Sequence, residues 1–333
     1  MAKPKIQSVQ SIASPPNSDK YQVKYGSQLT PQLLSSILRQ ADLGYMTGLA
    51  DILDETRELD SHAQSVLQKR EMAVSGSTWE VRPKDNSNKS KKAAKYADNC
   101  LRDIFNFSDS LSHLLSAIYH GRSACEIVWK KEGSKLIPVC LEPIHARRLS
   151  FAGDSWELKI YDTNGQSMFS KFPGIPISSF PLGKFIVHQP RILGNYPQRE
   201  GLGRLILWMS LFKRWGIKEG LSLAELSGRM ARVGTFQSGQ AGNIRATEED
   251  KRILEDALES WSGSNALIIP DTTKIEFIHP VSGNTIQIPL IEFFNSEISK
   301  CVLGNNLTTD VGSTGSRALG STHSNEQKIL QRN

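Results

Sequence analysis

The sequence has few cysteines and no long hydrophobic run. The four cysteines among 333 residues, Cys100, Cys125, Cys140 and Cys301, form no C-x-x-C pair. This spacing excludes the usual zinc and disulfide frameworks and is typical of buried thiols in a reducing compartment. The longest mainly apolar run, Leu205 to Phe212, is far shorter than the ~20 residues that a membrane helix needs. We therefore expect neither a membrane span nor a disulfide scaffold.

The common signatures of enzymes are also absent. The sequence contains no G-x-S-x-G elbow and no set of protein-kinase motifs. Six of the seven histidines are spread along the chain and lack the spacing of a metal hydrolase, namely His113, His120, His145, His188, His279 and His323. The acidic cluster between Asp51 and Asp60 has the pattern of a solvated helix face. We therefore predict a non-enzymatic protein with no cofactor and no metal site.

The composition is that of a folded protein with a mild positive charge. Hydrophobic residues make up 38% of the chain, and the formal net charge is +6. The length allows two domains or one large elaborated domain. The charge permits a nucleic-acid partner but does not require one. Residues 1–25 contain lysines but no apolar core and no cleavage site, which predicts a flexible arm rather than a secretory signal.

Residues 26–204 mix helical and strand-like patterns and predict an α+β domain. Apolar spacing predicts two helices between Thr30 and Val74, with a break near Gly44 and Gly48. The segment TWEVRP, residues 78–83, predicts a short strand. A third helix through Phe105 and a fourth that Gly121 closes should follow, and then several strands up to about residue 190.

A lysine-rich stretch precedes the third predicted helix. Its cations are Lys84, Lys89, Lys91, Lys92 and Lys95. Charge runs of this kind usually form a solvated face, so we interpret them as a solvated helix start.

Residues 205–233 predict one long helix with a basic side and an apolar stripe. At 100° per residue, four cations fall within about 60° of one another, namely Arg214, Lys218, Arg229 and Arg232. The neighbouring stripe should pack and consists of Leu205, Trp208, Phe212, Trp215, Leu223, Leu226 and Met230. Glycines at 216, 220 and 228 predict a kink or a close helix contact. Taken alone, the basic side fits a solvated surface as well as a binding surface.

An acidic segment follows, residues 234–285. Thr247 is a predicted N-cap, and the helix that it opens carries Glu248, Glu249, Asp250, Glu255 and Asp256. Strands NALIIP and KIEFIHP should complete a small α/β module. Pro289 is placed to open another helix over residues 286–304, which Gly304 terminates.

The loop LTTDVGSTGSRALGSTHSN, from Leu307 to Asn325, is rich in glycine and hydroxyl groups. Such a loop can cradle a phosphate. A nucleotide P-loop requires G-x-x-x-x-G-K-[ST], whereas Gly315 is followed here by Ser316 and Arg317. The sequence therefore argues against a nucleotide site.

Three segments together resemble the portal proteins of Mu-like bacteriophages and prophages. They are the run from KFIVHQP to GTF, the segment from ATEED to KIEF, and LGNNLTTDVGSTGSRALGSTHSNE. The resemblance extends from about residue 25 to the end, and LTTDVG-x-x-GSRALG is its most specific part. Portals of tailed phages are rings of about twelve subunits at a capsid vertex, through which DNA is packaged and ejected.

The resemblance implies a portal architecture for each part of the chain. Residues 26–204 would form the wing, 205–233 the first stem helix, 234–285 the clip and 286–304 the second stem helix. Residues 305–322 would form the tunnel loop, and 323–333 would begin the long helix behind it. The family continues into further wing and crown segments, which we expect to be absent from a sequence that ends at Asn333.

The resemblance also implies partners and candidate residues. Duplex DNA would slide past the tunnel loop at Thr308, Thr309, Ser313, Ser316 and Arg317 and past the basic stem side, without sequence specificity. Arg317 could instead pair with Asp310. The acidic clip residues would bind the terminase motor and later a head-completion or connector protein, while the wing would meet the capsid protein. The protein would act in the virion after assembly in the host cytoplasm. The alternative is an oligomeric tail or baseplate protein that does not contact DNA.

Overall fold

The computed structural model describes residues 29–153, 155–161, 174–192, 194, 196–228, 232–236, 247–249, 251–253, 256, 266–270 and 287–304. The chain divides into two compact units, Met1–Phe212 with Phe294–Asn333 and Lys213–Phe293, and each is described by itself. The predicted N-terminal arm lies outside the described residues. So do the predicted tunnel loop, residues 305–322, and residues 323–333.

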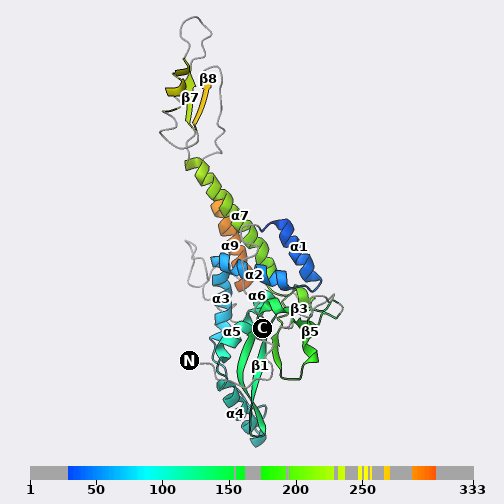
Figure 1. Ribbon diagram of the computed structural model, residues 1–333. Helices are drawn as coiled ribbons and strands as arrows, with labels where there is room; N and C mark the ends of the chain where they lie inside the picture. Colours follow the sequence, from blue (N-terminus) through cyan, green and yellow to red (C-terminus); the bar gives the residue numbers. More distant parts are fainter. Residues whose placement is uncertain are drawn as a thin grey trace. The chain divides into compact units, whose positions relative to one another are not determined.

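Three helices open the first unit, α1 (Pro31–Asp42), α2 (Thr47–Leu59) and α3 (Ser61–Ser75) (Figure 1). Thr30 caps α1 by accepting the Leu33 N–H. The predicted break falls at Gly44, whose φ is +97°. The prediction of two helices is wrong, because Asp60 ends α2 and its carboxylate caps α3 by accepting the Ala63 N–H at 3.1 Å.

A three-stranded antiparallel sheet follows, with β1 (Ser123–Glu132) between β2 (Lys135–Ile144) and β6 (Phe185–His188). Helices α4 (Asn88–Arg102) and α5 (Phe107–Leu115) contact it. Cys125 lies in the middle strand and packs with Ile104 and Leu141 in a small core. The predicted strands here are confirmed. The segment 78–83 is not a strand, because none of its residues enters the ladder of a described sheet.

Short elements connect this sheet to the rest of the unit. Helix α6 (Ala117–His120) leads into β1 through Gly121, whose φ is +80°. A second small sheet has the order β3 (Leu149–Phe151), β4 (Leu158–Ile160) and β5 (Ile175–Pro176). Three 3-10 turns lie in the connections, η2 (Ala146–Arg148), η3 (Ile177–Ser179) and η4 (Pro197–Arg199).

Arg122 joins these pieces from the inside. Its side chain is fully buried and donates to the carbonyl oxygens of Leu149 at 2.9 Å, Ala146 at 3.1 Å and His120 at 3.1 Å. Burial lowers the pKa of Arg122 to about 9. Arg122 also donates to the carbonyl oxygen of Met46 at 3.4 Å. The guanidinium therefore serves as an internal donor for three chain segments, those of Met46, His120 and Ala146–Leu149.

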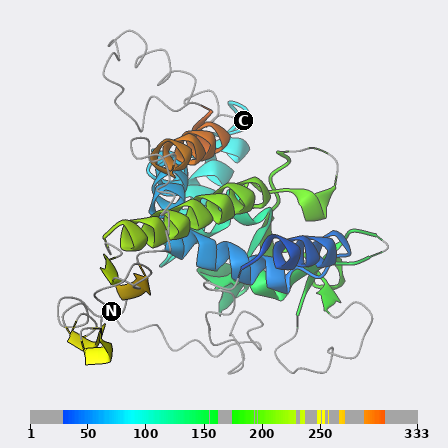
Figure 2. The same cartoon turned by 90° about the horizontal axis from the view of Figure 1, so that it is seen from above.

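Two long helices contribute to the main core of the first unit. Helix α7 (Gly203–Gly228) contributes Ile206, Leu207 and Leu211, and α9 (Gln287–Leu303) contributes Ile298 and Val302. The two helices lie side by side in both views (Figures 1 and 2). Between them, the Phe212 and Phe294 rings stack with centroids 6.2 Å apart. Helices α1 to α3 supply nine further residues of this core.

The second unit holds the rest of α7, the start of α9 and a parallel strand pair. Strand β7 (Arg232–Phe236) pairs with β8 (Ala266–Pro270). The described residues between 248 and 256 are helical. A Cβ placed on Gly216 would lie 3.7 Å from Leu290, which confirms the predicted close helix contact. The strand KIEFIHP lies outside the described residues.

The predicted stem boundaries need adjustment. Helix α7 is assigned to Gly228, five residues short of the predicted end at Val233, and α9 spans Gln287–Leu303 within the predicted range 286–304. Among the described residues, no helix is long and apolar enough to cross a membrane.

Candidate functional site

The predicted basic side of the stem is shorter than expected. Lys218 is exposed on α7, whereas Arg214 is half-buried and already has an interaction partner. Arg229 lies outside the described residues. Arg232 begins strand β7 and is not on the helix, so its inclusion in a helical face is wrong. The helix ends before this residue, and the 100° rule no longer relates its side chain to the others. Of the described residues, α7 therefore presents Arg214 and Lys218.

The apolar stripe of α7 packs only in part. The rings of Trp208 and Phe212 stack with centroids 5.9 Å apart, but Leu205 is 48% exposed and Phe212 is 38% exposed. The buried side of the helix carries Ile206 and Leu207 instead and is turned by about 160° from the stripe. In the second unit, Trp215, Ile217 and Leu221 are also exposed. At 100° per residue, Ile217 and Leu221 lie on the opposite side of α7 from the stripe residues Leu205, Phe212 and Trp215.

Helix α3 anchors the last turns of α9. The Ser299 hydroxyl is fully buried and lies 2.8 Å from Nε2 of His62. Arg70 donates from Nη1 to the carbonyl oxygen of Val302 at 2.6 Å. Gly304 ends the helix with a φ of +76°. The predicted tunnel-loop residues follow at once, and Thr308, Thr309, Ser313, Ser316 and Arg317 lie outside the described residues.

The acidic residues of the predicted clip are partly described. Glu248, Glu249 and Asp256 are exposed. Lys251 donates to Glu248 at 2.6 Å, and this hydrogen bond lowers the pKa of the Glu248 carboxyl. Asp250 and Glu255 lie outside the described residues. The exposed carboxylates of Glu249 and Asp256 are accessible to a partner.

The acidic cluster on α2 does not form a solvated face. Asp51, Glu55 and Asp60 are buried, so this interpretation is wrong for these three residues. Arg147 Nε lies 3.0 Å from Asp51 Oδ1, and the Ser210 hydroxyl donates to Asp60 at 2.7 Å. The carboxylates face inward because other elements bring donors to them, which helical spacing alone does not reveal.

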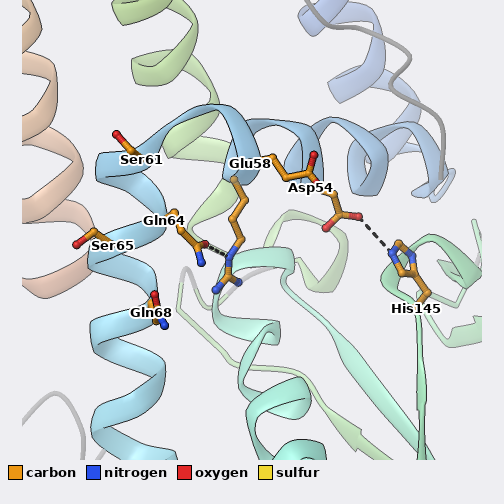
Figure 3. A pocket seen from close by; sticks show the side chains of 8 residues that line it. Asp54, Glu58, Ser61, Gln64, Ser65, Gln68 and His145 are labelled. Atoms are coloured by element: carbon orange, nitrogen blue, oxygen red, sulfur yellow. Dashed lines mark hydrogen bonds and ion pairs between the residues drawn. The ribbon is translucent and has the colours of Figure 1, made fainter.

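Asp54 contacts two histidines beside an open hollow of about 840 Å³; Figure 3 shows the hollow and one of the two, His145. His120 Nε2 lies 3.0 Å from one oxygen of Asp54, and His145 Nε2 lies 3.4 Å from the other. Burial opposes ionisation of Asp54, but the hydrogen bond and the charge of His120 outweigh it, so the pKa of Asp54 lies below its usual value. The sequence placed these histidines in separate elements, and no local signal connected them.

The same hollow is lined by polar side chains of α2 and α3. Arg57 donates to both carboxylate oxygens of Glu71, at 2.9 and 2.7 Å, and to Gln64 at 2.5 Å. Ser61, Gln64, Ser65 and Gln68 follow one another along α3. In the part of the chain that the structure describes, no group of three or more histidine, cysteine, aspartate or glutamate side chains could hold a metal ion. The contacts of Arg57 with Glu71 and Gln64 link α2 to α3 and hold the bend between the two helices.

Comparison with known proteins places this sequence in a family. The family model for the portal protein of Mu bacteriophage matches residues 50–333. The portal protein of Escherichia phage Mu is 28% identical over 92% of this chain, and the Mu-like prophage FluMu protein gp29 of Haemophilus influenzae is 27% identical over 92%. This chain spans 57% of the length of each relative.

Solved structures give a weaker likeness. One match is a chain from the neck of an empty gene transfer agent particle, computed with C6 symmetry, with a TM-score of 0.46 at 11% identity. This match covers 86% of the present chain and 72% of the solved chain. The neck of the native particle, computed with C12 symmetry, has a TM-score of 0.45 at 11% identity, with coverages of 88% and 75%. The match of the family model to most of the sequence establishes the assignment, and the chain belongs to the Mu bacteriophage portal protein family.

Proposed function

We propose that this chain forms a portal, a ring-shaped DNA channel at the capsid vertex through which the genome is packaged and later ejected. The observation that carries the proposal is the family match over residues 50–333. The function is structural and requires no catalytic residue, cofactor or metal.

Ring formation is supported by the exposed apolar side chains of α7. A head-to-tail contact repeated by rotation closes into a ring when the angle per subunit divides the circle. Leu205, Phe212 and Trp215 each leave more than a third of their surface exposed in the single chain. A neighbouring copy would cover them, and the proposed ring has about twelve copies.

DNA contact is proposed for the tunnel loop and the stem. A duplex must slide in both directions, so the channel needs weak contacts to phosphates rather than a binding pocket. Lys218 is an exposed cation of α7, and the loop adds Arg317 and several hydroxyl groups. A ring repeats each weak contact in every subunit, which makes single cations sufficient.

The clip is proposed to bind protein partners. The exposed acids Glu249 and Asp256 would repel DNA but would attract a basic protein surface. The partners we propose are the terminase motor during packaging and a head-completion or connector protein afterwards, with the capsid protein at the wing. The ring would be assembled in the host cytoplasm and remain in the virion.

The size of the purified assembly tests the proposal. We expect mass photometry and electron microscopy to find closed rings of about twelve subunits. Because this chain spans 57% of its relatives, a chain extended to their full length is measured in parallel. Three or six subunits would favour the tail or baseplate alternative. A monodisperse monomer at high concentration, for both chains, would contradict the ring.

A further inference from the structure

Helix α4 carries a row of lysines on its outer side. The helix lies beside the β1–β2 hairpin in Figure 1 and contacts β2. Its inner side carries Ala94, Ala97 and Leu101, which are all half-buried. At 100° per residue the lysines occupy an arc about 160° away from these residues. This arc, which we call the lysine face, consists of Lys89, Lys91, Lys92 and Lys95, and all four are exposed.

The lysine face has no carboxylate of its own. Among the described residues, no salt bridge or side-chain hydrogen bond reaches any of its four lysines. The acids nearby are already engaged, since Asp98 binds Arg102 at 2.9 Å and Glu80 binds Arg82. Asp85, just before the helix, accepts the Ser87 N–H at 2.9 Å. The four lysines of the lysine face are therefore not neutralised within the described part of the chain, whereas Arg102 of the same helix is.

Several lysines elsewhere in the described part of the chain have an acidic partner. Lys251 pairs with Glu248, Lys300 with Glu297 and Lys130 with Glu132. A solvated helix ordinarily gains from such oppositely charged neighbours, whereas like charges three and four residues apart destabilise it. On α4, Lys89 and Lys92 are three residues apart, and Lys91 and Lys95 are four apart. These lysines therefore repel one another in the isolated chain. Such an arrangement is expected where a bound polyanion supplies the negative charge that balances them.

The neighbouring hairpin extends the positive surface. Lys135 Nζ lies 5.4 Å from the ring centroid of Tyr96, and Tyr96 is at the edge of the lysine face. Lys131 is exposed on the same hairpin, whereas its neighbour Lys130 is paired with Glu132. From Lys89 to Lys95 the helix rises about 9 Å, over which one strand of a duplex presents two or three phosphates.

We propose that the lysine face is a second, sequence-independent contact for duplex DNA, separate from the channel residues of the stem. Lysines are flexible point charges that fit phosphates without fixed geometry. An acidic protein partner would require anchoring pockets around the cations. The described hollow beside Lys91 and Lys95 is shallow and contains the paired acids Glu80 and Asp98. The proposal goes beyond the channel function and does not depend on it.

Filter binding to a relaxed circular plasmid tests this contact, because a closed circle cannot thread a preformed ring. The test variant is Lys89→Gln/Lys91→Gln/Lys92→Gln/Lys95→Gln, since glutamine keeps the helix propensity of lysine. The matched control, Lys69→Gln/Lys159→Gln/Lys251→Gln/Lys300→Gln, removes the same charge from lysines that already have partners. Circular dichroism checks that both variants fold.

We expect the test variant to lose at least about tenfold in affinity at ~100 mM salt, with the slope of log K against log salt reduced by about 2 to 3. The control should lose much less. Equal losses in the two variants, or no loss in the test variant, would overturn the proposal. Binding of polyglutamate in preference to DNA would also overturn it and would indicate an acidic protein instead. Failure of ring assembly would contradict the channel proposal without affecting this result.

Discussion

Arg70 of α3 donates to the carbonyl oxygen of Val302, 2.6 Å away, and thereby supplies a cap for the last turn of α9. The last carbonyls of a helix have no partner within it, and a cation near them also interacts favourably with the helix dipole. The cap comes from a residue 232 positions earlier in the chain. It fixes the point at which the chain leaves α9 for the predicted tunnel loop.

Removing this cap should loosen the end of α9. We expect Arg70→Met to lower the free energy of unfolding by about 1–3 kcal/mol, because a hydrogen bond from a charged donor is lost and a carbonyl remains unpaired. Denaturant unfolding gives the energy, and hydrogen exchange should accelerate at residues 301–304. Arg82→Met is the control, because Arg82 is 82% exposed and its loss should change stability by less than about 0.5 kcal/mol. Equal effects of the two substitutions would contradict the cap.

Gly121 should not tolerate a side chain. Its φ is +80°, and an added Cβ would lie 2.1 Å from the carbonyl oxygen of Glu200. We expect Gly121→Ala to cost more than about 3 kcal/mol, because the clash adds to the backbone strain. Gly133 has a φ of +60° with nothing within 4 Å of the added Cβ, so Gly133→Ala should cost only about 1 kcal/mol. Thermal melts of the two variants separate packing from strain, and similar melting points would refute the close contact.

Asp54 should make stability depend on acid pH. Its pKa lies below the ordinary value of 3.8, mainly because His120 counteracts the effect of burial. A lowered folded-state pKa contributes stability that is present above the unfolded value and is lost as the pH falls through the folded value. We expect Asp54→Asn to be about 1–3 kcal/mol less stable at pH 6, with the difference disappearing toward pH 3. Chemical denaturation across this range measures it.

The control for this pH dependence is Asp103→Asn, which changes an exposed carboxylate at the end of α4. It should shift stability by less than about 0.5 kcal/mol at any pH. A pH-independent difference between wild type and Asp54→Asn would show that the contact with His120 is not ionic.

The exposed apolar side chains of α7 should matter for assembly and not for folding. We expect Leu205→Gln/Trp215→Gln to shift mass photometry from rings toward monomers while the melting point changes little, because both side chains are largely outside the core. Leu182→Gln changes a leucine that is fully exposed elsewhere and should leave the rings intact. Rings that survive the double substitution at normal yield would exclude this surface from the interface.

Arg317 should affect DNA movement without affecting stability. If it lines the channel, Arg317→Ala leaves ring assembly unchanged and alters DNA retention, with an effect that shrinks at high salt as phosphate contacts are screened. If it pairs with Asp310 instead, Asp310→Ala and Arg317→Ala share one defect that the double substitution does not deepen. Retention assays on the three variants distinguish these outcomes.

Local patterns in the sequence determined much of this protein. Helical spacing, caps and turn glycines indicated α1, α5, α7 and α9, and alternation indicated β1, β2 and β6. Residue-level resemblance alone identified the family, which the match over residues 50–333 confirms. These features are readable because each depends on neighbours a few residues apart.

Tertiary structure decided which side of each element is buried. Asp51 and Glu55 have the spacing of a solvated face, yet both are buried, because distant segments bring donors to α2. The segment 78–83 alternates like a strand but pairs with no described strand, since a ladder requires a neighbour at the right distance. Arg122 became an internal donor, and Arg70 a cap, through partners that no local pattern specifies. The physical reason is the same in each case: desolvation and hydrogen bonding depend on groups that only the folded chain brings together.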